Sequence, residues 1–136
     1  PVFPQLSLKE NLQIASGKLK RNEFEKRLDK LKQFFPLLTD TSLDVMQAGS
    51  LSGGERTQLC VAMSIFREPE FLVLDEPFAG LSPANARLIL NILDEYQKST
   101  KATVLLIAQD RQMASDFSLM HYIIRDGKIQ QDHVNK

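Results

Sequence analysis

The stretch FLVLDEP, residues 71–77, places four apolar residues directly before two adjacent carboxylates, Asp75 and Glu76. Such a run is typical of a buried parallel strand, which delivers its acids at the carboxyl end, where open α/β sheets bind their ligands. At that position Asp75 can reach a Mg²⁺ ion, directly or through water, and Glu76 can orient or deprotonate a water that attacks a γ-phosphate. A surface turn with two solvated acids is the alternative interpretation of the same residues.

A second motif, LSGGE at residues 51–55, leads directly into a predicted helix. Paired glycines in a first turn leave backbone N–H groups open to an anion, and the helix macrodipole adds about half a positive charge there. The hydroxyl of Ser52 can donate a further hydrogen bond to a phosphate oxygen. A capping box between Ser52 and Glu55 is the alternative interpretation. Capping gives no reason for Gly53 and Gly54, since each glycine costs about 1 kcal/mol against alanine inside a helix.

The remaining pattern divides the chain near residue 50. Residues 1–50 predict a helical part, with helices over 8–15, opened by a Ser7–Glu10 capping box, and over 22–35. Residues 51–136 alternate helical and strand signals, which predicts a mostly parallel α/β sheet with flanking helices. The elements expected in this second part are helices over 53–66 and 83–98, the latter capped by Ser82, a second buried strand over 103–108, and a hairpin at Asp126-Gly127.

Composition bounds the classes of function. The 136 residues are 43% hydrophobic and 25% charged, which suits one soluble domain with a core. Seventeen basic residues balance seventeen acidic ones, so no net charge favours nucleic acid or an anionic membrane as a partner. No apolar run approaches the roughly 20 residues of a membrane-spanning helix. We therefore expect a cytoplasmic protein without direct membrane insertion and without a nucleic-acid partner.

The two motifs, at residues 51–55 and 71–77, resemble at every position the signature sequence and the Walker B strand of the ABC transporter ATPases. Residues 78–83 resemble the D-loop of that family, although the usual Asp is Ser82 here. Residues 104–110 resemble the strand that leads into the H-loop, with Gln109 where most members carry His. Branched-chain amino acid importer ATPases often carry Gln there, so the resemblance favours that branch.

The resemblance implies a P-loop NTPase-like domain that binds ATP and Mg²⁺ and hydrolyses ATP to energise solute transport. It also implies a second ATPase subunit, met head to tail, and transmembrane permease subunits that hold the protein at the inner face of the cell membrane. Glu76 and Gln109 would be catalytic, and Asp75 would bind the metal. The residues that it assigns to nucleotide binding are Leu51, Ser52, Gly53, Gly54, Glu55, Asp75 and Ser82.

A phosphate loop (Gly, four residues, Gly-Lys, then Ser or Thr) is missing from the sequence, because neither Gly17-Lys18 nor Gly127-Lys128 has the required neighbours. We therefore expect this chain, which opens at Pro1, to be the back part of an ABC ATPase domain and to be inactive alone. Two alternatives remain open: a non-catalytic interaction module derived from an ABC ATPase, and an ABC ATPase of DNA repair or chromosome maintenance.

Overall fold

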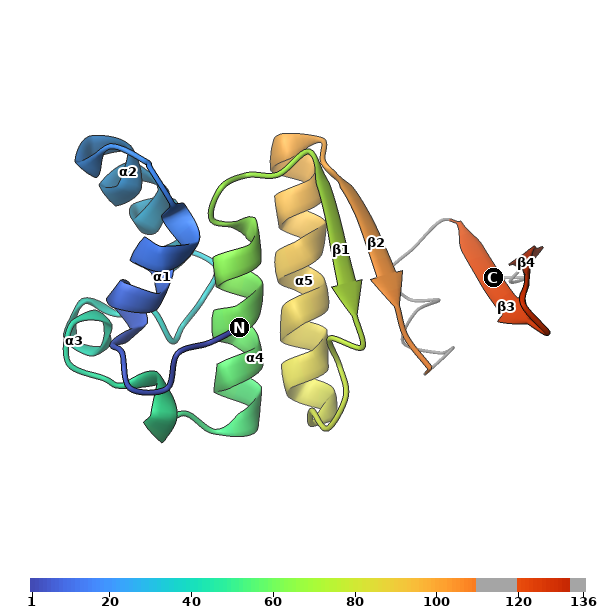
Figure 1. Ribbon diagram of the computed structural model, residues 1–136, viewed down its shortest axis with the longest axis horizontal. Coiled ribbons are helices and arrows are strands. Elements are labelled where there is room, and N and C mark those ends of the chain that lie inside the picture. Colours follow the sequence, from blue (N-terminus) through green and yellow to red (C-terminus); the bar gives the residue numbers. More distant parts are fainter. Residues whose placement is uncertain (110–119, 133–136) are drawn as a thin grey trace.

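The computed structural model describes residues 1–109 and 120–132. Helices form the first part of the chain (Figure 1). Two pairs of strands follow, and a long helix lies between the two strands of the first pair. In chain order the elements are α1 (Leu8–Ser16), α2 (Arg21–Lys32), α3 (Asp40–Leu43), a 3₁₀ turn (Ala48–Ser50), α4 (Gly53–Ile65), β1 (Phe71–Asp75), α5 (Pro83–Thr100), β2 (Thr103–Ile107), β3 (His121–Arg125) and β4 (Lys128–Asp132).

Helix α1 begins at the predicted capping box. The Ser7 backbone N–H donates to Glu10 Oε2 at 2.8 Å, and the Glu10 N–H donates to Ser7 Oγ at 3.2 Å. The fully buried Asn11 ties the preceding segment to this helix, because its Oδ1 accepts from the Phe3 N–H at 2.8 Å and its Nδ2 donates to the Phe3 carbonyl at 3.0 Å. Sequence reasoning did not single out Asn11, whose function here is structural.

A single apolar core joins the helices to the strands. Helix α1 contacts α4, and α4 contacts α5. The rings of Phe24 and Phe66 lie 5.0 Å apart and link α2 to the end of α4. This core extends from Leu8 to Ala102, so it crosses residue 50 without a break. The division into parts 1–50 and 51–136 stays a prediction.

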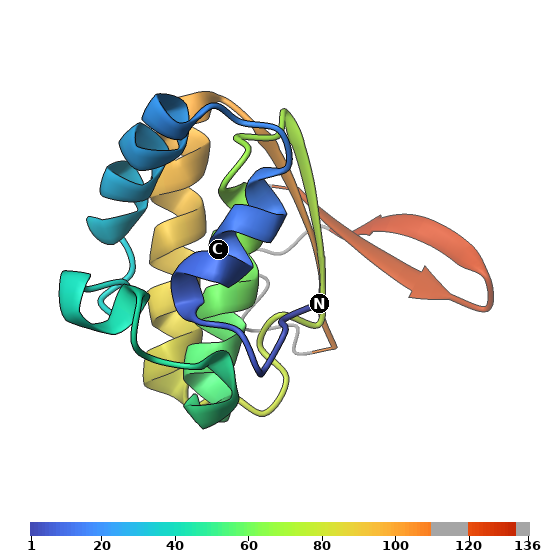
Figure 2. The same cartoon turned by 60° about the vertical axis from the view of Figure 1, so that its left-hand side comes forward.

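Strands β1 and β2 pair in parallel, from Phe71 opposite Thr103 to Asp75 opposite Ile107, and α5 connects them. Figure 2 shows α4 and α5 on the same side of this sheet. The prediction that both strands are buried is wrong. Leu72 is only 5% exposed, but the alternate residues that face away from the helices remain open, with exposures of 58% for Phe71, 49% for Val73, 45% for Leu105 and 44% for Ile107. Side chains alternate between the faces of a sheet, and in the described ranges helices cover only one face.

Strands β3 and β4 form the predicted antiparallel hairpin, with Arg125 opposite Lys128. The turn residues Asp126 and Gly127 both have positive φ, 49° and 71°, as the tightest hairpin turn requires. Across residues 1–109 and 120–132, no helix has both the length and the apolar character needed to cross a membrane.

Candidate functional site

Four element ends lie toward one end of the molecule. In Figures 1 and 2 the carboxyl ends of β1 and β2 lie at the same end as the N-terminal ends of α4 and α5. Residues 51–55 begin α4, Asp75 and Glu76 end β1, Ser82 precedes α5, and Gln109 follows β2. The fold therefore brings every predicted site residue to this end, where helix N-termini present unpaired N–H groups and a positive partial charge.

The start of α4 is closed by a capping box. Ser52 Oγ donates to Glu55 Oε2 at 2.7 Å, the Ser52 N–H donates to the same oxygen at 2.9 Å, and the Glu55 N–H donates to Ser52 Oγ at 3.3 Å. These hydrogen bonds, that from the Ser52 hydroxyl above all, lower the pKa of Glu55. Leu51 is buried and anchors the loop in the core. The structure thus contains the capping box between Ser52 and Glu55. The Ser52 hydroxyl must turn away from Glu55 before it can donate to a phosphate.

The two glycines of the motif have different surroundings. A Cβ added at Gly53 would meet nothing within 4 Å, so its backbone is open to an approaching group. A Cβ added at Gly54 would press on the Asn85 side-chain amide, with Asn85 Cγ at 3.1 Å and Cβ at 3.8 Å. Gly54 therefore lets the Asn85 side chain lie directly against the start of α4. Sequence reasoning missed Asn85, because nothing local connects it to Gly54, which lies 31 positions earlier.

Asp75 and Glu76 differ in backbone and orientation. Asp75 is exposed, and the alternation along β1 places it on the open face of the sheet with Phe71 and Val73. Glu76 has a φ of 49°, which is costly for a residue with a Cβ. Its N–H donates to the Ile107 carbonyl at 2.8 Å, which holds this conformation against the end of β2.

Two further predicted residues, Gln109 and Ser82, lie just outside β2 and α5. Gln109 is exposed two residues after β2. Ser82 is the N-cap of α5, as predicted, since its Oγ accepts from the Asn85 N–H at 3.3 Å. Both side chains are therefore accessible at the end of the molecule that also carries Asp75.

The carboxylates at this end of the molecule suit a metal ion that takes most of its ligands from a bound nucleotide and water. The part of the chain that the structure describes contains no group of three or more His, Cys, Asp or Glu side chains that could hold an ion. Asp75 nevertheless offers an exposed carboxylate at the strand end. Mg²⁺ commonly takes one or two carboxylates and completes its octahedral shell with substrate phosphates and water. The residues present therefore fit Mg²⁺ bound to a nucleotide.

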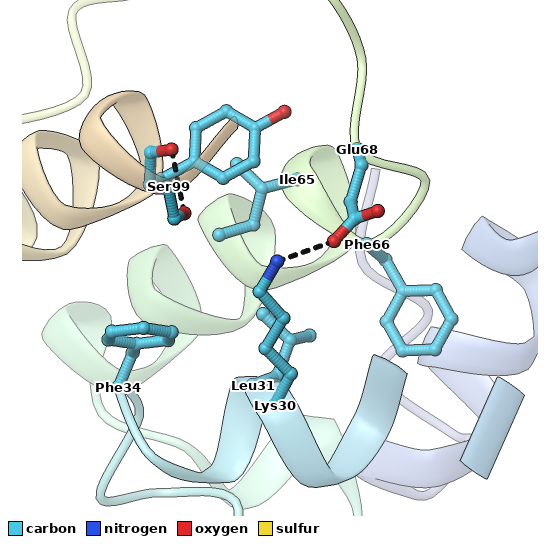
Figure 3. Close-up of a pocket in the computed structure, with 8 residues that line it drawn as sticks. Lys30, Leu31, Phe34, Ile65, Phe66, Glu68 and Ser99 are labelled. Carbon is cyan, nitrogen blue, oxygen red and sulfur yellow. Dashed lines mark hydrogen bonds and ion pairs between the residues drawn. The ribbon is translucent and has the colours of Figure 1, made fainter. Parts of the chain in front are cut away.

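A shallow pocket lies at the opposite ends of α4 and α5 (Figure 3). Lys30 Nζ and Glu68 Oε1 form an ion pair at 2.7 Å across it, and Phe34, Ile65 and Tyr96 contribute to its lining. None of the predicted site residues lines this pocket. Its contacts fasten α2 to the core, away from the strand ends.

The chain belongs to the ABC transporter family. The family model described as "ABC transporter" matches residues 1–79, which include both motifs, at residues 51–55 and 71–77. The resemblance found in the sequence is therefore confirmed.

Two curated relatives carry names from amino acid transport. The probable branched-chain amino acid transport ATP-binding protein LivF of Archaeoglobus fulgidus is 36% identical over 128 residues, which cover 94% of this chain and 53% of the relative. The high-affinity branched-chain amino acid transport ATP-binding protein BraG of Pseudomonas aeruginosa is 29% identical over 128 residues, covering 94% and 54% respectively. This chain thus spans about half the length of these relatives.

A solved structure shows the same fold. The chain resembles cbiO1 from Clostridium perfringens, described as part of the ABC transporter complex cbiONQ, with a TM-score of 0.80 and 25% identity over 96% of this chain and 51% of the other. The predicted fold class, a partial α/β domain of the P-loop NTPase-like ABC ATPases, is confirmed.

Proposed function

We propose that the natural protein containing this chain binds MgATP and hydrolyses it to energise transport of a solute across a membrane. The observation that carries this proposal is that an acid-tipped strand end and a glycine-opened helix start lie toward the same end of the fold. Open α/β sheets bind ligands at such strand ends, and helix N-termini bind phosphate. Family membership supports the same reaction.

The strand ends would carry the chemistry. Asp75 would bind Mg²⁺, directly or through water, and the metal would neutralise charge on the phosphates. Glu76 would orient the attacking water or accept its proton. Gln109 can donate an amide N–H to a phosphate oxygen, but it cannot carry a proton as a histidine can.

The start of α4 would serve a nucleotide held by a second copy of the protein. Backbone N–H groups at Gly53 and Gly54 and the hydroxyl of Ser52 would bind its phosphate, within a loop that Leu51 and Glu55 hold in place. Ser82 would lie at the same contact between subunits. This arrangement implies a dimer, with permease subunits that keep it at the inner face of the membrane.

The names of the two relatives favour branched-chain amino acids as the class of transported solute. Gln109 points to the same branch, because the importers of that branch often carry glutamine there. In the assembled transporter supplied with MgATP, this assignment requires that a branched-chain amino acid stimulate the ATPase rate and that a polyamine leave the rate unchanged.

Glu76→Gln in the natural protein tests the catalytic assignment. The amide keeps the shape of the side chain but cannot accept a proton, so we expect ATP hydrolysis to fall at least about a hundred-fold. Glu70→Gln is the matched control, because Glu70 is an exposed glutamate at the amino end of the same strand. Phosphate release under saturating MgATP measures both variants. Unchanged hydrolysis in Glu76→Gln, or an equal loss in Glu70→Gln, contradicts the assignment.

A further inference from the structure

Helices α4 and α5 lie side by side and run parallel (Figure 1). Near their N-terminal ends, Gly54 faces Asn85. Near their C-terminal ends, Ile65 and Tyr96 line one pocket. Both pairs are separated by eleven residues along their helices, about three turns, so the two helices stay in register from one contact to the other.

Parallel packing places two helix N-termini together. Each carries a positive partial charge of about half a unit, so the two ends repel each other and need packing to hold them in contact. Ser52 caps one helix and Ser82 caps the other, which puts residues 51–55 beside the segment that leads from Glu76 to Ser82. A closely fitting contact at this point therefore fixes two functional segments relative to each other.

The Gly54–Asn85 contact has the features of such a fit. Asn85 is half buried, and its amide occupies the space that a Gly54 side chain would fill. One turn further along α4, Gln58 is also polar and is only 7% exposed. Further along the two helices the buried residues include the apolar Ile65 and Ile89. An apolar residue at position 85 would serve core packing equally well, so packing alone does not explain the amide.

We propose that Asn85 is a positioning residue, which holds the loop 51–55 against the start of α5 and so ties the position of Ser52 to that of the segment carrying Glu76 and Ser82. Through this contact the phosphate-facing loop and the strand end of one subunit move together. This inference rests on the proposed function, because the loop is assumed to bind a phosphate.

A double-mutant cycle on the natural protein tests the contact. In Gly54→Ala the new methyl group displaces the Asn85 amide. We expect this variant to melt about 2 °C or more below Gly53→Ala, which gains the same helix propensity without the displacement. In Gly54→Ala/Asn85→Ala the two methyl carbons meet at the 3.8 Å that separates an added Cβ from Asn85 Cβ, an ordinary contact, so most of the loss is recovered. Gly53→Ala is the control for melting, since its methyl group meets open space.

Steady-state ATPase kinetics test the positioning role. We expect Asn85→Ala to lower kcat about ten-fold while KM changes less than about two-fold, because misplaced groups slow the reaction without removing contacts that hold the substrate. Asn91→Ala is the matched control, an exposed asparagine on the same helix, and it should leave kcat unchanged.

The contact between Gly54 and Asn85 and the positioning role of Asn85 can fail separately. A Gly54→Ala protein as stable as Gly53→Ala, or a double variant with no recovery, overturns the contact. Recovery of stability together with an unchanged kcat in Asn85→Ala overturns the positioning role. If Glu76→Gln also leaves hydrolysis unchanged, the proposed function itself fails, although the recovered melting temperature would still establish the contact between the helices.

Discussion

At the scale of single residues, Glu76 combines a proposed catalytic carboxylate with an unfavourable backbone. Its φ of 49° lies in the left-handed region, as do those of Glu68, Lys101 and Asp126, which end or connect elements. Such conformations cost on the order of 1 kcal/mol or more and persist where the surrounding structure fixes them. At Glu76 the hydrogen bond from its N–H to the Ile107 carbonyl supplies that constraint.

Replacement of Glu76 should therefore separate stability from activity. We expect Glu76→Gly to be more stable than Glu76→Ala by about 1 kcal/mol, because glycine adopts positive φ without a steric cost. Both variants lack the carboxylate and should hydrolyse no ATP. Urea unfolding followed by circular dichroism measures the difference in stability. Equal unfolding free energies for the two variants would show that the backbone at this position stores no strain.

At the scale of elements, the sequence predicted those features that depend on neighbouring residues. The helix starts at Ser7, Ser52 and Ser82 rest on hydrogen bonds to residues three positions later, so their signal is local. The Asp126-Gly127 hairpin has the same local origin. For this reason helices and strands were found nearly at their observed positions.

Burial and tertiary contacts could not be predicted in the same way. The apolar run of β1 indicated a strand covered on both faces, but exposure depends on what lies over each face, and Val73 remains 49% exposed. The approach of Asn85 to Gly54 depends on how α4 and α5 pack. The paired glycines predicted a site for a phosphate, and the closeness of the Asn85 side chain to Gly54 had no signal in the sequence.

The end of α5 offers a test of helix termination. Lys101 has a φ of 59°, and its N–H donates to the Gln97 carbonyl at 2.8 Å, which ends the helix in a left-handed turn. Glycine is favoured at such a position, so Lys101→Gly should raise the free energy of unfolding by about 1 kcal/mol.

The same substitution inside the helix supplies the control. Lys98 lies in the last turn of α5 and pairs with Asp94 at 2.6 Å. Lys98→Gly should lower the free energy of unfolding by about 1 kcal/mol, since glycine is unfavourable within a helix. Urea unfolding of both variants should give changes of opposite sign, and changes of the same sign would refute the described helix end.

At the scale of the whole molecule, one face of the fold combines apolar and acidic groups. Phe71 and Val73 share the open face of β1 with Asp75, and Leu105 and Ile107 continue it on β2. A chain segment packed over these apolar residues would therefore also lie beside Asp75. Exposure of this size is unusual for a stable single domain, which agrees with a chain that spans about half the length of its relatives.

In the dimer proposed for the natural protein, each nucleotide would be bound by residues from both subunits. The start of α4 should act on the nucleotide of the partner, whereas Glu76 should act on the nucleotide of its own subunit. Two different variants, each inactive alone, should then complement each other when mixed. Gly53→Asp is suited to this purpose, because its carboxylate repels phosphate while its side chain meets open space.

The most direct test of the account is therefore the ATPase rate of an equal mixture of Gly53→Asp and Glu76→Gln subunits, dissociated and reassembled together. Half of the random dimers pair the two variants and hold one intact site each, so the mixture should recover about a quarter of the wild-type rate. Each variant alone should show almost none. A mixture no more active than its components would contradict the claim that the helix start and the strand end serve different nucleotides.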